Sequence, residues 1–392
     1  MNTPPSARLS LRSQMPVTAK WAYFDHAAVA PLPQSTATAI SQWLGDASEE
    51  GDTCWPRWAK EVEATRQAAA TLLSAQSEEI ALVPNTTAGI NLVAEGFPWS
   101  AGDNVITLEN EFPSNLFPWM NLTGRGVECR RVPVEKGRVD LQHIDEAIDN
   151  RTRIVSVSWV GFASGWRIDP KALAELCHRR GTLFFLDAIQ GLGVFPLDVN
   201  LAGIDFLAAD GHKWLLGPEG AGILYVRQEH LARLRPLNVG WNSVPASQKF
   251  DSRNMELRPT AARYEGGTQN VAGMVGLGAS LKMLRELGVG PSQSPVAEWV
   301  LDVTDHASSR LLTFGAKLIS PHEGENRSGI LTFQLPGQEP AEIRERLLKA
   351  GIVTSCRGGG VRLSPHGYNT REEIDRVIDV LQEGVMDRAT SR

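Results

Sequence analysis

The sequence is poor in the features that would place it at once in several common classes of protein. Among its 392 residues it has only four cysteines, Cys54, Cys129, Cys177 and Cys356, which form neither a CxxC pair nor a zinc-binding spacing. We therefore expect reduced thiols, a cytoplasmic location and no metal site. No apolar run approaches the length of about 18 residues that a membrane-spanning helix needs, so we expect no such helix.

An excess of basic residues is also missing. The 39 Lys and Arg residues are outnumbered by 45 Asp and Glu, which gives a formal net charge of −6 and no electrostatic footprint for nucleic acid. Hydrophobic residues make up 42% and charged residues 21%, values typical of a globular protein. No GxGxxG turn opens the first predicted strand–helix unit, which argues against a Rossmann-type dehydrogenase.

The N-terminal segment contains Arg8 and Arg12 but has no acidic residue before Asp25. Its prolines, Pro16 among them, disfavour a continuous amphipathic helix. We therefore predict that residues 1–20 form a loose N-terminal arm, free to pack against the C-terminal unit.

Short β-rich runs alternate with helical patterns between about residues 78 and 228. Strands are predicted at Ile80–Val83, Asn104–Leu108, Arg153–Val160, Thr182–Leu186, Phe206–Ala209 and Ile223–Val226, and helices at Ala88–Glu95, Leu141–Asp149 and Pro170–Arg180. Most of these strands are continuous apolar runs, as expected when both faces of a sheet are covered. The alternation predicts an α/β fold with a mostly parallel sheet, whose ligands bind at the carboxyl ends of the strands.

The character of the sequence changes after Arg227. A loop-like stretch leads to a predicted helix near residue 271, and a smaller α+β unit follows, with strands near Gly329–Gln334 and Val361–Leu363. The predicted organisation is an N-terminal arm, a large domain and a small C-terminal domain over residues 1–20, 21–268 and 269–392.

Two residues at the ends of predicted strands indicate the chemistry. Asp187 ends a strongly apolar strand, where a carboxylate needs a cationic partner unless it merely caps a helix. Lys213 follows the next strand, and a buried lysine amine loses its proton readily and attacks carbonyl groups, whereas a surface lysine would only snorkel. An enzyme that uses pyridoxal 5′-phosphate (PLP) needs such a lysine, an acid for the pyridine nitrogen and donors for the phosphate.

A third element offers those phosphate donors. Thr86 and Thr87 lie in the sequence Pro84-Asn85-Thr86-Thr87-Ala88-Gly89, directly after the strand Ile80–Val83 and at the start of a helix. Free N–H groups and a positive dipole end make a helix N-terminus a seat for phosphate, and the two hydroxyl groups add donors.

Together with other motifs, these elements resemble the class V aminotransferase family of fold-type I PLP enzymes, which includes cysteine desulfurases, selenocysteine lyases and isopenicillin N epimerase. The matching motifs run along nearly the whole chain, at 23–28, 85–89, 111–115, 187–190, 211–220, 265–268 and 361–370. The resemblance implies a PLP-dependent fold-type I architecture and an enzyme that acts on an α-amino acid.

The resemblance also implies a role for each matching residue around the cofactor ring. Lys213 would form the Schiff base with PLP and later move protons at the substrate Cα. Asp187 would keep the pyridine nitrogen protonated, and Gln190 would hydrogen-bond the phenolic oxygen. Phe112 falls where many relatives have a histidine that stacks on the ring, and a phenyl ring can stack but cannot exchange protons.

The same resemblance implies that Thr86, Thr87 and His212 hold the phosphate. Thr268 would reach it from a second subunit, so the resemblance implies a homodimer with shared sites. Asp210 stands where desulfurases often have a phosphate-binding serine, and because a carboxylate would repel phosphate we assign it no such role.

On the substrate side, Arg362 matches the arginine that grips the α-carboxylate, in agreement with the bidentate fit of a guanidinium to a carboxylate. His26 is a weaker candidate for contact with the substrate, and the alternative is that it packs in the N-terminal turn. The aromatic segment Ser158–Trp166 is expected to line the substrate side of the pocket.

Cys356 marks a departure from the desulfurases, which carry a nucleophilic cysteine on a mobile loop before this arginine. Here Cys356 lies only six residues before Arg362, and the loop is shortened. We interpret Cys356 as a buried thiol at a strand edge, with a reactive thiol as the alternative.

The residues therefore leave several reactions open. We place an aminotransferase or carbon–sulfur lyase first, a cysteine desulfurase that uses Cys356 second, and an amino-acid or peptide epimerase third. A PLP-binding protein without catalytic activity is a further hypothesis, against which the complete set of Lys213, Asp187, Gln190 and Arg362 argues.

Overall fold

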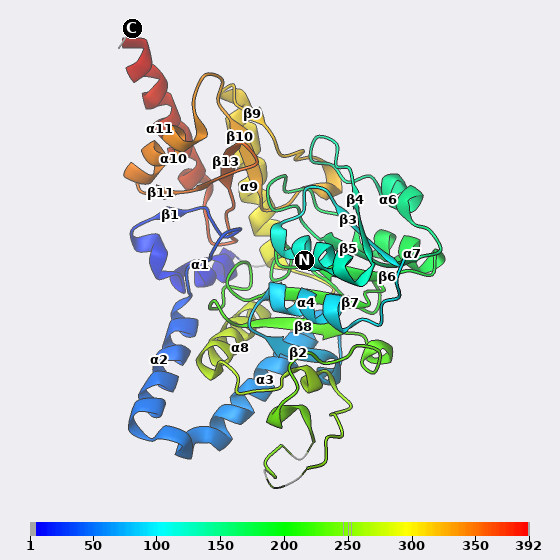
Figure 1. The fold of residues 1–392 in the computed structure, drawn as a ribbon. Helices are drawn as coiled ribbons and strands as arrows, with labels where there is room; N and C mark the ends of the chain where they lie inside the picture. The colour runs from blue at the N-terminus through cyan, green and yellow to red at the C-terminus, as the bar shows by residue number, and fades with distance from the viewer. Residues whose placement is uncertain (1–4, 246, 250, 252, 391–392) are drawn as a thin grey trace.

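The computed structural model describes residues 5–245, 247–249, 251 and 253–390 (Figure 1). The strands are β1 Ala22–Tyr23, β2 Ile80–Val83, β3 Asn104–Leu108, β4 Glu128–Val132, β5 Thr152–Ser158, β6 Leu183–Asp187, β7 Phe206–Asp210, β8 Gly222–Val226, β9 Lys317–Leu318, β10 Leu331–Gln334, β11 Ile352–Val353, β12 Ser355–Arg357 and β13 Gly360–Leu363. The α-helices are α1 Pro5–Ser13, α2 Gln34–Glu49, α3 Trp55–Leu73, α4 Thr86–Gly96, α5 Phe117–Asn121, α6 Leu141–Ala147, α7 Pro170–Arg179, α8 Val271–Glu286, α9 Pro295–Thr313, α10 Pro340–Lys349 and α11 Arg371–Thr390.

The central sheet confirms the predicted α/β architecture. Its strand order within the described residues is β2-β8-β7-β6-β5-β3-β4, and its strands are parallel except for β8, which pairs antiparallel with both β2 and β7. Each predicted strand of this region is present, within one or two residues at its ends. The edge strand β4 was not predicted.

Helices cover both faces of this sheet, so its strands are apolar on both sides. Alternate residues of the strands contribute to two separate hydrophobic clusters. On one face, α4 packs on β7 with Ile90 and Val93 buried, and on the other, α7 packs on β6 with Leu173 and Cys177 buried. This arrangement leaves the carboxyl edge of the parallel strands as the place for polar side chains.

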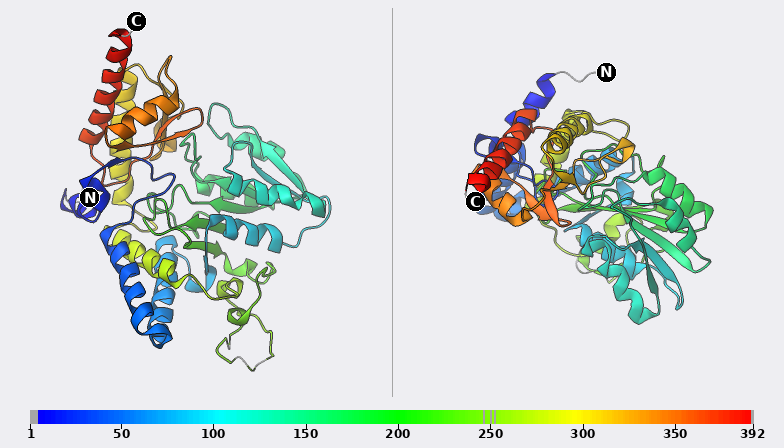
Figure 2. Two further views of the ribbon diagram at one scale, coloured as in Figure 1. Left: turned by 60° about the vertical axis from the view of Figure 1, so that its left-hand side comes forward. Right: turned by 90° about the horizontal axis from the view of Figure 1, so that it is seen from above.

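A second, smaller sheet lies beside the C-terminal helices (Figures 1 and 2). Its strand order is β12-β13-β10-β9, and α9, α10 and α11 contribute to the hydrophobic cluster on one face of it. The helix α8 contacts α2 and α3 and joins the core of the large sheet. The domain boundaries at residues 20 and 268 stay a prediction.

The N-terminal segment is not loose in its described part, which corrects our expectation. Residues 5–13 form α1, in which Pro5 occupies the first helical position, where the missing N–H costs nothing. Arg8 donates to the carbonyl oxygens of Gly367 and Asn369 at 2.9 and 2.7 Å, and Arg12 forms an ion pair of 2.9 Å with Glu373. These contacts fix α1 to the small unit.

None of the described helices is both long enough and apolar enough to cross a bilayer. The four cysteines form no disulfide with one another.

Candidate active site

A cavity of about 380 Å³ lies at the carboxyl edge of the large sheet and extends to the hairpin β12–β13. It gathers eight of the ten site residues expected from the sequence, namely Thr86, Thr87, Phe112, Asp187, Gln190, His212, Lys213 and Arg362. They come from the ends of β2, β3, β6, β7 and from β13, and so from segments far apart in the chain. The other two, His26 and Thr268, do not line this cavity.

Lys213 follows β7 and is only 8% exposed. Burial lowers the pKa of its ammonium group to about 8, while the carboxylate of Asp187 acts in the opposite direction and the cation of Arg362 adds to the lowering. The Nζ atom lies 5.6 Å from the centre of the Phe112 ring. The amine is therefore neutral near physiological pH far more often than an exposed lysine, and in that form it can attack a carbonyl carbon.

Asp187 ends β6 and is 2% exposed. Among the described residues, the one hydrogen bond to its carboxylate comes from the backbone N–H of Ile189 at 3.1 Å, and burial raises the pKa of this carboxyl group to about 6. No cation lies within 4.0 Å of it in the described part of the chain. A buried carboxylate of this kind suits a cationic group that enters the cavity, such as a protonated pyridine nitrogen.

The start of α4 forms the other end of the cavity. Thr86 and Thr87 occupy the first turn of the helix, where backbone N–H groups have no internal acceptors. The buried Oγ1 of Thr86 has no hydrogen-bond partner among the described residues. His212, whose Nδ1 lies 3.0 Å from Oδ1 of Asp210, lines the same cavity. The donors present here fit a phosphate group.

Gln190 and Phe112 are held in place by neighbours. The side-chain oxygen of Gln190 accepts a hydrogen bond from Trp214 at 2.8 Å, and its amide group donates to the backbone oxygen of Ala27 at 3.0 Å. The ring of Phe112 meets that of Phe162 edge-on at 5.3 Å. Phe162 lies in the aromatic segment 158–166, of which Ser158 and Val160 also line the cavity, as predicted.

Arg362 lies on β13 and is 1% exposed. It donates to the backbone oxygen of Phe162 at 2.8 Å and to the carboxylate of Asp25 at 3.1 Å. Its buried Nε has no partner among the described residues. The guanidinium group is thus fixed at the cavity wall with a donor left over for an anion.

The register of the hairpin β12–β13 decides where Cys356 points. Cys356 pairs with Val361, and Ser355 pairs with Arg362. Side chains alternate across a strand, so Arg362 shares one face with Ser355, and Cys356 shares the opposite face with the core residue Val361. Cys356 does not line the cavity, and burial raises the pKa of its thiol.

Glu111 is a buried acid beside the cavity to which the sequence analysis gave no role. Its carboxyl group accepts a hydrogen bond from the backbone N–H of Ser158 at 2.7 Å and also contacts the Ser158 hydroxyl group. Burial raises the pKa of Glu111 to about 7, and the charge of Asp187 adds to this effect. An acidic residue at the end of an apolar strand was the available signal, the same one that identified Asp187.

His26 packs in the N-terminal turn, the structural alternative considered above. It is fully buried, its Nδ1 lies 2.9 Å from the backbone oxygen of Ser364, and its Nε2 lies 2.8 Å from the hydroxyl group of Tyr368. Burial lowers the pKa of its imidazole well below the usual value. Both ring nitrogens are therefore occupied, and His26 has no free group to offer a substrate.

Thr268 lines a different groove, together with Trp55, Arg66 and Trp241. The turn that carries it is fixed by Glu265, whose carboxylate pairs with the buried Arg66, with 3.0 Å between Oε2 and Nη2. Thr268 therefore does not reach the cavity of its own chain.

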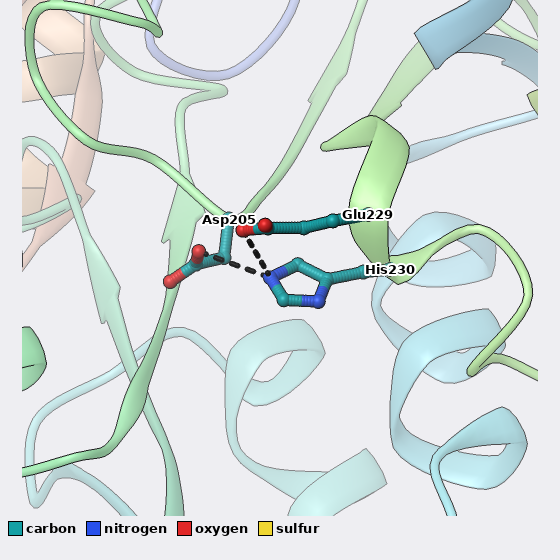
Figure 3. Close-up of side chains that lie close together, drawn as sticks. All are labelled: Asp205, Glu229 and His230. Carbon is teal, nitrogen blue, oxygen red and sulfur yellow. Dashed lines mark hydrogen bonds and ion pairs between the residues drawn. The ribbon is translucent and has the colours of Figure 1, made fainter.

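A cluster of possible metal ligands lies at the opposite end of β7, where Asp205, Glu229 and His230 approach one another (Figure 3). Asp205 is already bonded to two histidines, His178 at 2.8 Å and His230 at 3.2 Å. The guanidinium group of Arg227 lies 3.7 Å from the same carboxylate. A cation that close opposes metal binding, and the cluster is adequately explained as a structural ion-pair network.

Comparison with known proteins agrees with this geometry. The family model described as aminotransferase class-V matches residues 22–377. The chain is 31% identical over 397 aligned positions to a probable cysteine desulfurase of Methanothermobacter thermautotrophicus, with 95% of this chain and 97% of the relative covered. It is also 31% identical to a cysteine desulfurase of Klebsiella pneumoniae, with 92% of each chain covered.

Solved structures give the same fold. A cysteine desulfurase of Thermococcus onnurineus superposes with a TM-score of 0.87 at 24% identity, covering 99% of both chains. The cysteine desulfurase CsdA of Escherichia coli gives a TM-score of 0.86 at 25% identity, covering 97% of this chain and 98% of the other.

The fold is that of a fold-type I PLP-dependent enzyme. The protein belongs to the class V aminotransferase family, and its cofactor is PLP.

Proposed function

We propose that this enzyme is a carbon–sulfur lyase that acts on L-cysteine or a closely related sulfur-bearing amino acid and releases the sulfur to solution. The substrate class rests on the two cysteine desulfurases that are 31% identical to this chain. The fate of the sulfur rests on one observation, the position of Cys356 on the face of its hairpin that points away from the cavity.

In this proposal each residue of the cavity binds one part of the cofactor or of the substrate. Lys213 holds the cofactor covalently, and Asp187 stabilises the protonated pyridine nitrogen. The first turn of α4 and His212 would bind the phosphate, Gln190 would hydrogen-bond the phenolic oxygen, and Phe112 would pack against the ring. Arg362 binds the substrate α-carboxylate.

The bound cofactor supplies an electron sink for a bond broken at the substrate Cα. The freed amine of Lys213 takes the Cα proton, because burial lowers its pKa toward the working pH, where a general base is most effective. The bond between Cβ and sulfur then breaks, and sulfur leaves with the bonding electrons as hydrosulfide. Addition of water to the remaining three-carbon fragment gives pyruvate and ammonia, so cysteine and water are converted to pyruvate, ammonia and sulfide.

The experiment supplies L-cysteine to the purified holoenzyme without any keto acid and measures sulfide, pyruvate, ammonia and alanine. We expect sulfide, pyruvate and ammonia in equal amounts over many turnovers, and Cys356→Ala to change the rate by less than about twofold. Alanine and a protein persulfide that are lost in Cys356→Ala would instead establish a desulfurase that uses this thiol. One keto acid per site, with loss of the cofactor's visible band, would establish an aminotransferase, and inversion at Cα alone an epimerase.

We further propose a cytoplasmic homodimer in which Thr268 binds the phosphate in the partner's site. The support is that Thr268 lies outside the cavity of its own chain, on a turn fixed by a buried ion pair. Mixing of Lys213→Ala and Thr268→Ala chains tests this, because a mixed dimer would contain one site with both residues intact. We expect activity to appear on mixing, and two inactive parents that stay inactive after subunit exchange would refute the shared site.

A further inference from the structure

The cavity contains one cation for which the proposed reaction has no use. Lys213 serves the cofactor and Arg362 the substrate α-carboxylate, but Arg357 also lines the cavity. Its side chain donates a hydrogen bond to the backbone oxygen of Cys356 at 2.8 Å, and no carboxylate of the described residues lies within 4.0 Å of it.

The hairpin places Arg357 on the same face as Arg362. Arg357 pairs with Gly360, and Arg362 pairs with Ser355, so the two arginines are diagonal neighbours across the pair of strands. The Cα atoms of such neighbours lie about 7–8 Å apart. Two like charges at this spacing repel each other unless an anion lies between or beside them. Among the described residues, the carboxylate of Asp25 lies within 4.0 Å of Arg362 but not of Arg357.

The turn of the hairpin is rigid, which fixes the position of Arg357. Gly358 and Gly359 have φ angles of +56° and +78°, both positive as in a type I′ turn. A Cβ atom on Gly358 would lie 3.2 Å from that of Ala163, and the backbone oxygen of Gly359 accepts a hydrogen bond from Gln334 at 2.7 Å. The tip is therefore packed against the aromatic segment that lines the cavity, and Arg357 is not carried on a long loop.

We propose that Arg357 forms a second anion-binding subsite of the cavity, which binds α-amino acids whose side chain ends in an oxyanion, a carboxylate or a sulfur oxyacid, more tightly than the cavity binds L-cysteine. This inference rests on the proposed function for the place of the α-carboxylate at Arg362. The side chain of the substrate extends between the two arginines, so its distal oxyanion meets the guanidinium group of Arg357. An amino acid with a neutral side chain leaves that cation unpaired.

Equilibrium binding to the holoenzyme tests the subsite without turnover. Succinate and butyrate have four carbons each and lack an amino group, so they differ mainly in the distal carboxylate. Isothermal titration calorimetry should give a Kd about tenfold lower for succinate, the size of effect expected from one charge-assisted contact. Arg357→Gln should abolish this preference and leave the Kd for butyrate within about twofold.

The matched control is Arg376→Gln, because Arg376 is also exposed and donates to a backbone oxygen, that of Ala350, but lies outside the cavity. This control should keep the preference. Equal affinities of the wild-type enzyme for both acids would overturn the proposal, and so would an equal loss of both affinities in Arg357→Gln, which would place Arg357 at the α-carboxylate. Absence of sulfide release with the preference intact would refute the lyase activity alone.

Discussion

The carboxylate of Asp25 lies 3.1 Å from Nη2 of Arg362 and joins the N-terminal segment to the small sheet at the wall of the cavity. The two side chains are 16% and 2% exposed, so the guanidinium group depends on Asp25 for its charge balance whenever no substrate is bound. The oxygen that accepts from Arg362 also accepts a hydrogen bond from Ser355 at 2.7 Å, which fixes its position. Asp25 is therefore a positioning residue for the substrate-binding arginine.

Replacement of Asp25 by asparagine should destabilise the ligand-free protein by roughly 3 kcal/mol, because it leaves a buried cation uncompensated. A bound carboxylate replaces the missing charge, so butyrate should raise the Tm of Asp25→Asn more than that of the wild type. Thermal unfolding with and without butyrate measures both effects. Equal shifts in the two proteins would show that Arg362 does not contact the carboxylate.

The lowered pKa of Lys213 predicts how the apoenzyme takes up its cofactor. The amine must be neutral to attack the aldehyde, so the rate of reconstitution with PLP should rise with pH with a midpoint near 8 rather than near the usual 10.5. Asp187→Asn should move the midpoint lower, because the carboxylate of Asp187 favours the charged amine. Stopped-flow absorbance gives the profile, and a midpoint above 10 would mean that Lys213 is not desolvated.

The raised pKa of Glu111 predicts that the stability of the folded protein depends on pH. Its pKa is raised from the usual 4.5 to about 7 in the folded protein, so the folded state binds its proton more tightly than the unfolded state. The resulting stabilisation is present below pH 4.5 and is lost as the pH rises to about 7. Glu111→Gln keeps the hydrogen-bonding shape without the charge, so relative to the wild type it should be more stable at pH 8 than at pH 5.

Denaturant unfolding at the two pH values measures this difference. Glu109→Gln is the control, since Glu109 is exposed and accepts one backbone hydrogen bond, from Val134 at 3.0 Å. The same difference between wild type and Glu111→Gln at both pH values would show that Glu111 is ionised in the folded protein throughout.

The sequence predicted the interior of the large sheet well because those strands are buried on both faces. β2 and β3 have the predicted bounds, since each is a short apolar run between polar residues. The edge strand β4 contains Arg130 and Arg131, and only its last residue, Val132, is buried, so it has no apolar run. The helix α2 was also missed. Ile40, Trp43 and Ala47 recur in it at helical spacing, but these side chains are only partly buried, and Thr36 is its one fully buried residue.

The sequence predicted those site residues whose role depends on a single side chain. It did not predict features of the site that depend on contact between two distant segments of the chain. Lys213 and Asp187 each follow an apolar strand, a pattern visible in the sequence. The pairing of Asp25 with Arg362 joins residues 337 positions apart, and the orientation of Cys356 depends on the register of a hairpin. Neither relationship can be inferred from the spacing of these residues in the sequence.

Reduction of the holoenzyme with sodium borohydride, followed by peptide mass spectrometry, tests directly whether Lys213 carries the cofactor. Reduction makes the bond between cofactor and lysine permanent, so we expect one pyridoxyl group per chain, on Lys213, and none on the Lys213→Arg variant. A pyridoxyl group on another lysine, or no modification of Lys213 in a protein that holds PLP, would contradict this expectation.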